Sequence, residues 1–428
     1  MILTASTSSK VGATNVNAIA SATAAFRQFM VYAATTISQA ITGSVGLIKN
    51  GTGTLTLTGT NTYTEATTIS AGTLTISGTG QLGGGSYAGN IANTGALIHV
   101  ATTNQTLSGI MSGTGALTKS GTSTLTLNPG ASSSVGIFTL TNGSVLLSSG
   151  TLSVTTNSGL RMGSSLAPTF TLNGGNLNTT SNAYIGGDFT GGRATFTLTS
   201  GTWTHTSSFI SVQFGSSGNG SVMNVNGGLV DSPRIQLGQN AGTSTLNLNG
   251  GIVSVDSFFN TGSTSVLNLN GGTLRARTTS TNFLGFAGSF SVNVMTGGAI
   301  FDTNSLNLTV TVPLLSGTAG DGGLTKQSAG TLFLDGALSY LGPTNIVGGF
   351  LRAKKTVGAS TATATFTGGG TSLSVVFDVS PPAAATTNFR FFQGTTTQTY
   401  GTITLTGVPV GTTATYTSAT STLAVTVP

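Results

Sequence analysis

Short runs of alternating apolar and polar residues recur along the middle of the chain, and each ends in a polar residue followed by one or two glycines. The run Thr245-Leu-Asn-Leu-Asn-Gly-Gly251 shows the pattern. Alternation over about four to eight residues predicts a half-buried β-strand, and the glycines predict a tight turn. The final glycines of six such runs are Gly175, Gly201, Gly228, Gly251, Gly272 and Gly298.

The spacing of these glycines, 21 to 27 residues, indicates the size of the repeating unit. Repeats of about 20–50 residues are typical of solenoids and propellers, but a propeller blade needs about 40 residues. We therefore expect each unit to form one coil of a parallel β-helix. Within a coil, Leu246 and Leu248 face one way, while Asn247 and Asn249 face the other. Stacked coils can then bury a continuous core that one coil cannot bury alone.

Stacking of the coils places the repeated asparagines and glycines above one another. Asparagine side chains stacked in this way hydrogen-bond in ladders, which need no charge. The pattern therefore predicts structural turn and ladder positions rather than a catalytic site. These positions are Asn173, Gly175, Asn226, Gly228, Asn249, Gly251, Asn270 and Gly272.

A longer unit occurs three times and carries a lysine at the same place in each copy. The first copy runs from Gly46 through Lys49 and Thr54-Leu-Thr-Leu57 to Gly59-Thr-Asn-Thr-Tyr63 and Ile69-Ser-Ala-Gly-Thr-Leu74. The other two copies keep Lys119 and Lys326 and the Leu-x-Leu strand that follows, although the asparagine is lost.

These residues resemble the autotransporter-associated β-strand repeat of large bacterial surface and secreted β-helices. The resemblance covers residues 46–74, 115–127 and 323–351 directly. It implies a passenger-like, adhesive or structural role, outside the cell or at the cell surface of a bacterium. It implies no activity, because function depends on a site rather than on a fold.

The two ends of the chain differ from the middle. Residues 11–41 carry apolar residues at helix-like spacing, which predicts a short helical segment that caps the first coil or contacts a neighbouring subunit. The final segment, from Phe366, predicts a small β segment. We therefore divide the chain into an N-terminal cap or contact segment (1–42), solenoid repeats (43–365) and a C-terminal β segment (366–428). The candidate subunit-contact residues are Phe26, Phe29, Met30 and Ile37.

Together these patterns predict an all-β protein, a right-handed parallel β-helix with a short helical N-terminal segment. The composition agrees, because 64 of 428 residues are glycine and only 5% are charged, against about 25% in ordinary globular proteins. No run of about 18 apolar residues is present, so we expect no membrane-spanning helix. The net charge of +6 is too dilute for a nucleic-acid binder. The absence of cysteine excludes thiolate chemistry, and we expect no cofactor or metal.

The acidic residues are the natural place to look for an enzyme, because β-helical polysaccharide lyases and hydrolases need clustered carboxylates. Asp231 and Asp256 are one coil apart, so they either pair to hold a cation or do acid–base work, or are solvated turn residues. Asp321, in a Gly-Asp-Gly-Gly sequence, suggests either a calcium-binding turn or an ordinary turn. The full set is Glu65, Asp188, Asp231, Asp256, Asp302, Asp321, Asp335 and Asp378.

The remaining candidate residues each allow a functional and a structural interpretation. We expect His99 and His205 to be surface or lone ladder residues rather than metal ligands. We expect Lys49, Lys119 and Lys326 to be solvated edge charges that discourage wrong strand pairing; ligand binding is the alternative. One basic set either binds an anionic polymer or stays solvated; its members are Arg275, Arg277, Arg352, Lys354 and Lys355. One aromatic set either stacks on sugars or packs at a rim; its members are Trp203, Tyr63 and Tyr340.

Three functions remain open from the sequence. The first is a non-enzymatic extracellular structural protein whose copies assemble into a fibre, sheath or surface layer. The second is a monomeric adhesin or passenger that binds cells or matrix glycans. The third is a polysaccharide lyase or hydrolase. We expect the first, with the protein itself as the main partner and a polysaccharide or cell surface as a further one.

Overall fold

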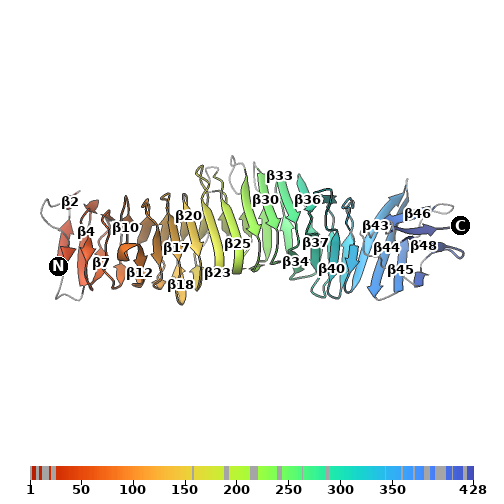
Figure 1. Ribbon diagram of the computed structural model, residues 1–428, viewed down its shortest axis with the longest axis horizontal. Helices are drawn as coiled ribbons and strands as arrows, with labels where there is room; N and C mark the ends of the chain where they lie inside the picture. Colours follow the sequence, from red (N-terminus) through yellow and green to blue (C-terminus); the bar gives the residue numbers. More distant parts are fainter. Residues whose placement is uncertain are drawn as a thin grey trace. The chain divides into compact units, whose positions relative to one another are not determined.

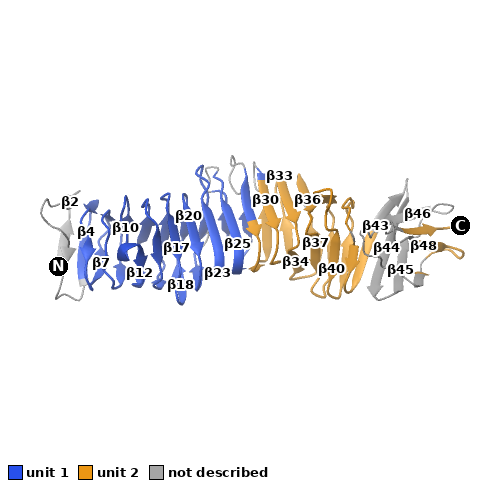
Figure 2. Cartoon of the chain, in the orientation of Figure 1, with its two compact units in different colours: residues 1–223, 239–243 blue, residues 224–238, 244–428 orange. Residues whose placement is uncertain are grey.

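The computed structural model describes residues 2–5, 9–11, 19–20 and 26–428, with gaps within the last range. The gaps are residues 157–158, 188–191, 213–219, 239–242, 263, 286–288, 343, 358–359, 370–371, 380–385, 391–401, 407 and 418–421. The chain is an all-β parallel β-solenoid of about 13 turns, which confirms the predicted fold class. It separates into two compact units, Met1–Met223 with Gln239–Thr243, and Asn224–Gly238 with Ser244–Pro428 (Figure 2).

In the first unit, equivalent strands of successive coils stack in parallel (Figure 1). One row contains β1 (Ile2–Ala5), β4 (Phe26–Val31), β7 (Gly46–Asn50), β9 (Thr67–Ile69), β12 (Ile91–Asn93) and β15 (Met111–Ser112). A second contains β2 (Ser9–Val11), β5 (Thr35–Ile37), β8 (Thr54–Leu57), β10 (Thr73–Ile76), β13 (Ala96–His99), β16 (Ala116–Lys119), β19 (Phe138–Leu140), β22 (Leu160–Met162), β24 (Ala183–Ile185) and β26 (Ile210–Val212). The third contains β11 (Ser86–Tyr87), β14 (Gln105–Leu107), β17 (Thr124–Leu127), β18 (Ser132–Val135), β20 (Ser144–Leu147), β21 (Thr151–Val154), β23 (Thr169–Thr179) and β25 (Thr195–His205). The remaining elements are β3 (Ile19–Ala20), β6 (Ile41–Thr42), the short 3₁₀ turn η1 (Gly83–Gly85) and β27 (Ser221–Val225).

The second unit repeats the same arrangement. Its solenoid strands are β28 (Leu229–Asp231), β29 (Arg234–Leu237), β30 (Thr243–Leu248), β31 (Ile252–Val255), β32 (Ser257–Phe259), β33 (Thr264–Leu269), β34 (Thr273–Ala276), β35 (Ser280–Leu284), β36 (Phe290–Val294), β37 (Ala299–Asp302), β38 (Leu308–Val310), β39 (Leu314–Ser316), β40 (Leu324–Gln327), β41 (Thr331–Leu334), β42 (Thr344–Ile346) and β43 (Phe350–Val357). Antiparallel pairing then replaces the parallel stack, since β43 pairs with β44 and β44 with β45. The last strands are β44 (Ser360–Gly369), β45 (Ser372–Val379), β46 (Thr386–Arg390), β47 (Thr402–Thr406), β48 (Thr413–Thr417) and β49 (Thr422–Thr426).

The core consists of columns of apolar side chains that run from coil to coil. Leu55 lies beside Leu74, and Leu97 continues the column to Leu117. All four are at most 2% exposed, and burying one leucine side chain contributes about 2 kcal/mol. The register advances by 19 residues between Leu55 and Leu74. A coil this short holds β8 and β9 before β10 begins the next coil, because each strand needs only three or four residues.

The predicted turn glycines take the backbone through the left-handed region. Gly175, Gly228 and Gly251 have φ of 75°, 70° and 64°, which L-residues with a Cβ rarely adopt. A Cβ on Gly251 would also lie 2.5 Å from the Gly227 carbonyl carbon of the coil below. In the next coil the left-handed residue is Gly271 rather than Gly272, so the turn there is one residue earlier than predicted.

The helix predicted for residues 11–41 is wrong over its described part, which contains the end of β2, strands β3, β4 and β5, and the start of β6. Phe29, Val31, Ile37 and Ile41 are buried there. Buried positions alternate within each strand, but the bends separate Val31 from Thr35 and Ile37 from Ile41 by four residues. A four-residue step is also the spacing of one helix face. Residues 12–18 and 21–25 lie outside the described residues. In the part of the chain that the structure covers, no helix is long and apolar enough to cross a membrane.

Candidate functional site

The lysine of the first long repeat lies inside the solenoid. Lys49 is on β7, two residues after Leu47, so both side chains point inward, and both are fully buried. The Lys49 Nζ donates to three carbonyl oxygens at the bend that follows the strand. These belong to Asn50 (3.1 Å), Gly51 (2.8 Å) and Ala71 (3.0 Å). The ammonium therefore joins the bend of its own coil to the bend of the next coil.

The third repeat reproduces this geometry in the second unit. Lys326, on β40, is also fully buried. Its Nζ donates to the carbonyl oxygens at the same three relative positions in the chain. These belong to Gln327 (2.9 Å), Ser328 (2.7 Å) and Gly348 (2.9 Å).

Lys119 of the second repeat is buried as well, and its Nζ donates to the Gly121 carbonyl and, at 3.4 Å, to that of Asn142. The prediction that the three lysines are solvated edge charges is therefore wrong. The Leu-x-Lys spacing carried the signal, since residues two apart on a strand share a face. Arg27 is a buried cation that the sequence analysis missed; its guanidinium donates to the carbonyls of Val45 and Thr42.

Burial lowers the pKa of Lys49, Lys119 and Lys326 to about 8. The physical cause is desolvation, which disfavours the charged form. Beside Lys326, the Asp302 carboxylate opposes part of this shift of its pKa. At neutral pH the three ammonium groups remain charged, and bind carbonyl oxygens as fixed internal cations.

The tyrosine of the long repeat closes a second internal cluster. The Tyr63 hydroxyl and the Thr67 Oγ1 are 2.7 Å apart, and Thr67 Oγ1 is 2.8 Å from the Tyr87 hydroxyl of the next coil. The rings of Tyr63 and Tyr87 meet edge to face. The third repeat keeps the same spacing, since the Tyr340 hydroxyl is 2.6 Å from Thr344 Oγ1. Burial raises the pKa of Tyr63 well above its usual value and that of Tyr340 to about 12.

The asparagine of the first repeat is another residue whose role the sequence did not reveal. Asn61 is fully buried. Its Oδ1 accepts from the Ile41 amide of the preceding coil at 3.0 Å, and its Nδ2 donates to the carbonyls of Gly59 (2.8 Å) and Gln81 (2.9 Å). One side chain therefore links three consecutive coils, where strand pairing gives way to a bend.

The two repeats in which these contacts recur coincide with the result of the family comparison. Residues 47–76 and 324–353 match the family model described as passenger-associated-transport-repeat. The chain carries two passenger-associated-transport-repeats. This confirms the resemblance for the first and third copies of the long unit. Comparison with curated proteins and with solved structures finds no match.

The side chains that the two passenger-associated-transport-repeats of this chain share form hydrogen bonds inside the fold. Lys49 and Lys326 donate to carbonyl oxygens at bends, and Tyr63 and Tyr340 hydrogen-bond to a threonine four residues later. Tyr63 is fully buried and Tyr340 half-buried, so Tyr63 presents no ring face on which a sugar could stack.

The acidic residues also act within the fold. Asp231 pairs with Arg277 at 3.1 Å, and Asp256 accepts from Thr278 Oγ1 at 3.1 Å. The two carboxylates are not opposite each other, because the register partner of Asp231 is Ser254. Of the two alternatives, the carboxylate pair is therefore not formed at this place in the described structure.

Asp321 and Asp302 serve turns. Asp321 is buried and accepts backbone amides of Gly323 (3.1 Å), Leu341 (2.7 Å) and Gly342 (2.7 Å), which makes it a turn residue. Asp302 pairs with Arg275 at 2.8 Å. Burial alone would raise the Asp302 pKa, but hydrogen bonds from Ser328 and Arg275 hold it below its usual value. Among the described residues, no group of three or more His, Asp or Glu side chains could hold a metal ion.

The predicted basic cluster does not form a free cationic patch in its described part. Arg275 and Arg277 are held by Asp302 and Asp231. The Arg352 guanidinium lies over the Phe333 ring, 4.7 Å from its centroid. The side chains of Lys354 and Lys355 lie outside the described residues.

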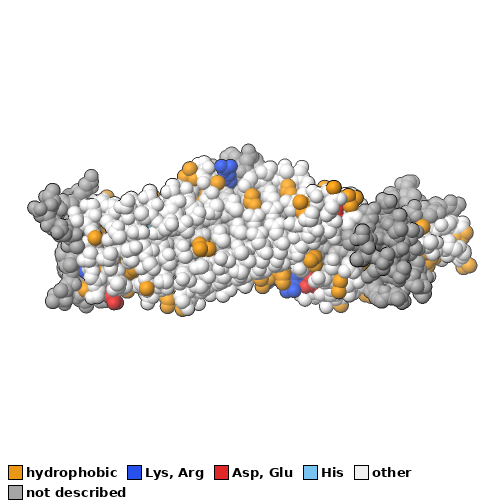
Figure 3. All heavy atoms as spheres, in the orientation of Figure 1, with side chains coloured by type: hydrophobic (Ala, Val, Ile, Leu, Met, Phe, Trp, Pro, Cys, Tyr) orange, Lys and Arg blue, Asp and Glu red, His pale blue; other side chains and the backbone are white. Residues whose placement is uncertain are grey.

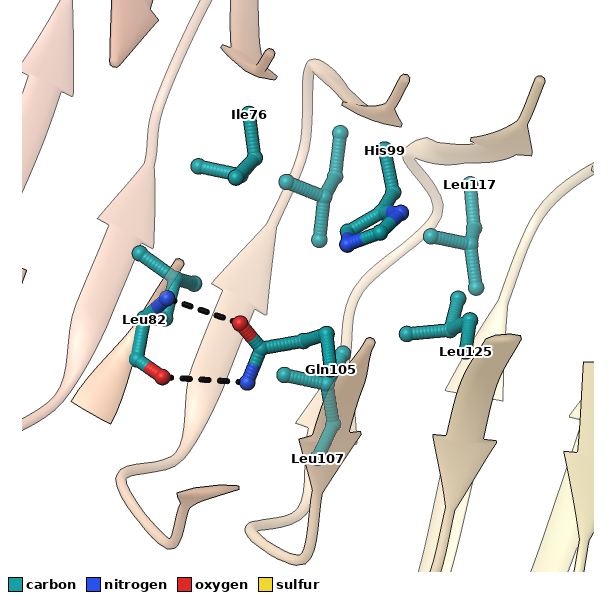
Figure 4. Close-up of a pocket in the computed structure, with 8 residues that line it drawn as sticks. Ile76, Leu82, His99, Gln105, Leu107, Leu117 and Leu125 are labelled. Carbon is teal, nitrogen blue, oxygen red and sulfur yellow. Dashed lines mark hydrogen bonds between the residues drawn. The ribbon is translucent and has the colours of Figure 1, made fainter. Parts of the chain in front are cut away.

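His99 lines a small cavity in the core of the first unit (Figure 4). It is 3% exposed, and neither ring nitrogen has a hydrogen-bond partner. Burial, and then the charge of Lys119, lower the His99 pKa to about 4, so the ring is neutral at pH 7. Gln105 closes the cavity by accepting from the Leu82 amide and donating to its carbonyl. The other lining residues are Ile76, Leu97, Leu107, Leu117 and Leu125.

His205 and Trp203 belong to one buried network, and neither is at the surface. Trp203 is fully buried, and its Nε1 donates to Thr179 Oγ1 at 2.9 Å. The same hydroxyl is 2.8 Å from His205 Nδ1, and Trp203 packs against Phe196 with ring centroids 4.4 Å apart. Burial lowers the His205 pKa to about 4. The interpretation of Trp203 as a sugar-stacking or rim residue is wrong, because its ring is part of the core.

The predicted ladder asparagines of the second unit hydrogen-bond to one another. Asn249 Nδ2 donates to Asn226 Oδ1 at 2.9 Å, and Asn270 Nδ2 donates to Asn249 Oδ1 at 3.1 Å. A second ladder lies two residues earlier and was not singled out from the sequence. It links Asn224, Asn247, Asn268 and Asn293 at 2.8–2.9 Å. In the first unit, Asn173 accepts instead from Ser200 Oγ at 3.3 Å.

The candidate subunit-contact residues have different positions. Phe29 and Ile37 are at most 2% exposed within the first unit, so their side chains contact their own chain. Met30 is half-buried, with Sδ 3.4 Å from Gln28 Nε2. The side chain of Phe26 lies outside the described residues.

Proposed function

We propose that this protein is a non-enzymatic, extracellular structural solenoid of a bacterium, and that its copies assemble into a fibre, sheath or surface layer. The two passenger-associated-transport-repeats and the β-solenoid fit a passenger-like structural protein. The repeat is also what supports a location outside the cell or at its surface.

The observation that supports the structural role is that the buried ionisable side chains bind other groups of the same chain. Lys49, Lys119 and Lys326 bind bend carbonyls inside the coils. Asp302 and Asp321 are held by an arginine and by backbone amides. An active site requires reactive groups directed towards a cleft. These buried charges are directed at the protein's own backbone and side chains, which favours a scaffold over a lyase or hydrolase.

Self-assembly is supported by the low charge and regular surface of the stacked sheets. Each sheet, which forms one wall of the solenoid, is a run of parallel strands in register, and the surface in view within each unit is largely uncharged (Figure 3). A net charge of +6 over 428 residues produces little repulsion between copies. Regular uncharged walls therefore favour association more than the charged surface of an ordinary globular protein does.

Negative-stain electron microscopy of the purified chain at several concentrations tests this proposal. We expect ordered fibres or sheets that lengthen as concentration rises. A variant with lysine at the outward positions Thr56, Thr75 and Thr118 should assemble less, because like charges would then line one wall. The same three positions changed to serine serve as the control. Isolated molecules at every concentration would sink the assembly proposal and favour a monomeric adhesin.

A further inference from the structure

One wall of the second unit carries two adjacent rows of amide side chains. The inner row is Asn224, Asn247, Asn268 and Asn293, and the outer row is Asn226, Asn249 and Asn270. We call this surface, on strands β27, β30, β33 and β36 and the turns after them, the amide face. Strands are about 4.8 Å apart and alternate residues about 6.7 Å apart, so the amides form a two-dimensional grid.

In the middle of the two rows, the ladder bonds do not exhaust the hydrogen-bonding capacity of Asn268 and Asn249. A primary amide has two N–H donors and an oxygen with two lone pairs. Asn268 donates once, to Asn247 Oδ1 at 2.8 Å, and accepts once, from Asn293 Nδ2 at 2.9 Å. Asn249 has the same two ladder bonds and is exposed. Each therefore retains a donor and an acceptor, fixed in orientation by its neighbours in the row.

The amide face carries no ionisable residue, because β27, β30, β33 and β36 contain no Lys, Arg, Asp or Glu. Two ion pairs among the described residues of this unit, Arg275 with Asp302 and Arg277 with Asp231, are on β28, β34, β37 and the residue after β34. Those positions follow the glycine turns, beyond the amide rows. A third row beside the amides is equally neutral and consists of Thr245, Val266 and Ser291.

This chemistry excludes most classes of partner. Nucleic acids and acidic polymers require cations that neutralise phosphates or carboxylates. A protein partner other than a further copy of this chain would depend on aromatic or arginine anchors in pockets, and lipid surfaces depend on an apolar face. A neutral polymer of hydroxyl groups needs what the amide face has, since every hydroxyl both donates and accepts.

We propose that the amide face binds a neutral, hydroxyl-rich polysaccharide laid across its rows. Single contacts of this kind are weak in water, but a repeating polymer on a repeating grid makes many at once, and linked contacts multiply affinity. This binding is separate from the proposed assembly and does not require it.

Depletion binding of the full chain to microcrystalline cellulose and to an insoluble β-1,3-glucan gel tests the inference. Thr245→Lys places a long charged side chain beside the amide rows at a half-buried outward position on β30. Thr273→Lys makes the same change at a half-buried outward position on β34, beyond the turn, and serves as the matched control. We expect wild type and Thr273→Lys to bind at least one polymer alike. We expect Thr245→Lys to bind roughly tenfold more weakly.

Binding should also survive about 0.5 M salt, which screens charge–charge attraction. Equal binding by all three proteins, no binding to either polymer, or loss in salt would overturn the inference. Sedimentation without polymer separates it from assembly. If Thr245→Lys reduces pelleting of the protein alone as much as it reduces depletion, the occupant of the amide face is a second copy, and the inference fails.

Discussion

Single lysine residues in this protein provide hydrogen-bond donors to carbonyl oxygens at the bends of the coils. A bend that breaks the strand ladder leaves carbonyl oxygens without partners, and buried unpaired carbonyls are costly. Lys49 and Lys326 each bind three carbonyl oxygens at such bends, one of them from the next coil. The ammonium is itself stabilised by these oxygens, since buried charges are tolerated only when they are hydrogen-bonded.

Replacing Lys326 by alanine should destabilise the solenoid strongly. The change removes the lysine donor from the Ser328 and Gly348 carbonyl oxygens and opens a cavity, at a cost of about 3 kcal/mol. The midpoint of urea unfolding, followed by circular dichroism, should fall accordingly. Thr325→Ala, at the adjacent outward position, is the control and should change the midpoint little. Equal midpoints for the two variants would contradict an internal role for the ammonium.

The buried histidines predict loss of stability in mild acid. Their pKa is about 4 in the fold and about 6.5 in the unfolded chain. Between these values the unfolded state binds more protons, so stability falls as pH drops from 6.5 to 4 and levels off below that. Each histidine accounts for up to about 3 kcal/mol.

The His99→Leu variant isolates this effect from carboxylate titration. Leucine fits the apolar cavity around position 99 and cannot take up a proton. Urea midpoints measured at pH 7 and at pH 4.5 should therefore differ less for the variant than for wild type. A pH dependence identical to that of wild type would show that His99 titrates normally in the fold.

At the scale of strands and turns, the asparagine ladder allows a test with an internal standard. Asn268 makes two ladder bonds, whereas Asn293 makes one ladder bond, to Asn268. Asn268→Ala should therefore lower stability about twice as much as Asn293→Ala, at about 1 kcal/mol per bond. Thermal unfolding monitored by circular dichroism measures both. A larger effect from Asn293→Ala would show that packing, not the ladder, governs these positions.

Two turn glycines allow the effect of backbone conformation to be measured apart from the effect of a steric clash. Gly220 has φ of 86° with open space where a Cβ would lie, while Gly251 has φ of 64° and would clash with the Gly227 backbone. Gly220→Ala should cost about 1 kcal/mol, from the backbone conformation alone. Gly251→Ala should cost more, because the clash forces neighbouring coils apart. Unfolding midpoints decide, and equal losses would show that conformation alone sets the requirement.

The sequence predicts the features that neighbouring residues determine, and it does not predict contacts between residues of different coils. Coil length follows from the spacing of glycines such as Gly228 and Gly251, because a turn is set by its own residues. The inward direction of Lys49 was also readable, from its parity with Leu47. Its partners were not, because the Ala71 carbonyl comes from the next coil. The strands around Ile37 were missed because a bend resets the alternation, which mimics helical spacing.

At the scale of the whole molecule, the net charge is small for the length of the chain. Raising sodium chloride screens the remaining net charge of +6. Assembly should therefore increase or stay constant with salt when followed by light scattering. Dissociation on adding salt would indicate that ion pairs between copies hold the assembly together.

The buried lysines also affect how long the chain survives among digestive enzymes. A trypsin-like protease needs an accessible, extended segment around a lysine or arginine, and cleavage follows local opening of the structure. Lys49, Lys119, Lys326 and Arg27 are at most 1% exposed and tied to backbone carbonyls. A cut at any of these four of the chain's 14 basic residues first requires a coil to unravel. The contacts that hold the bends thus also remove cleavage sites from the surface.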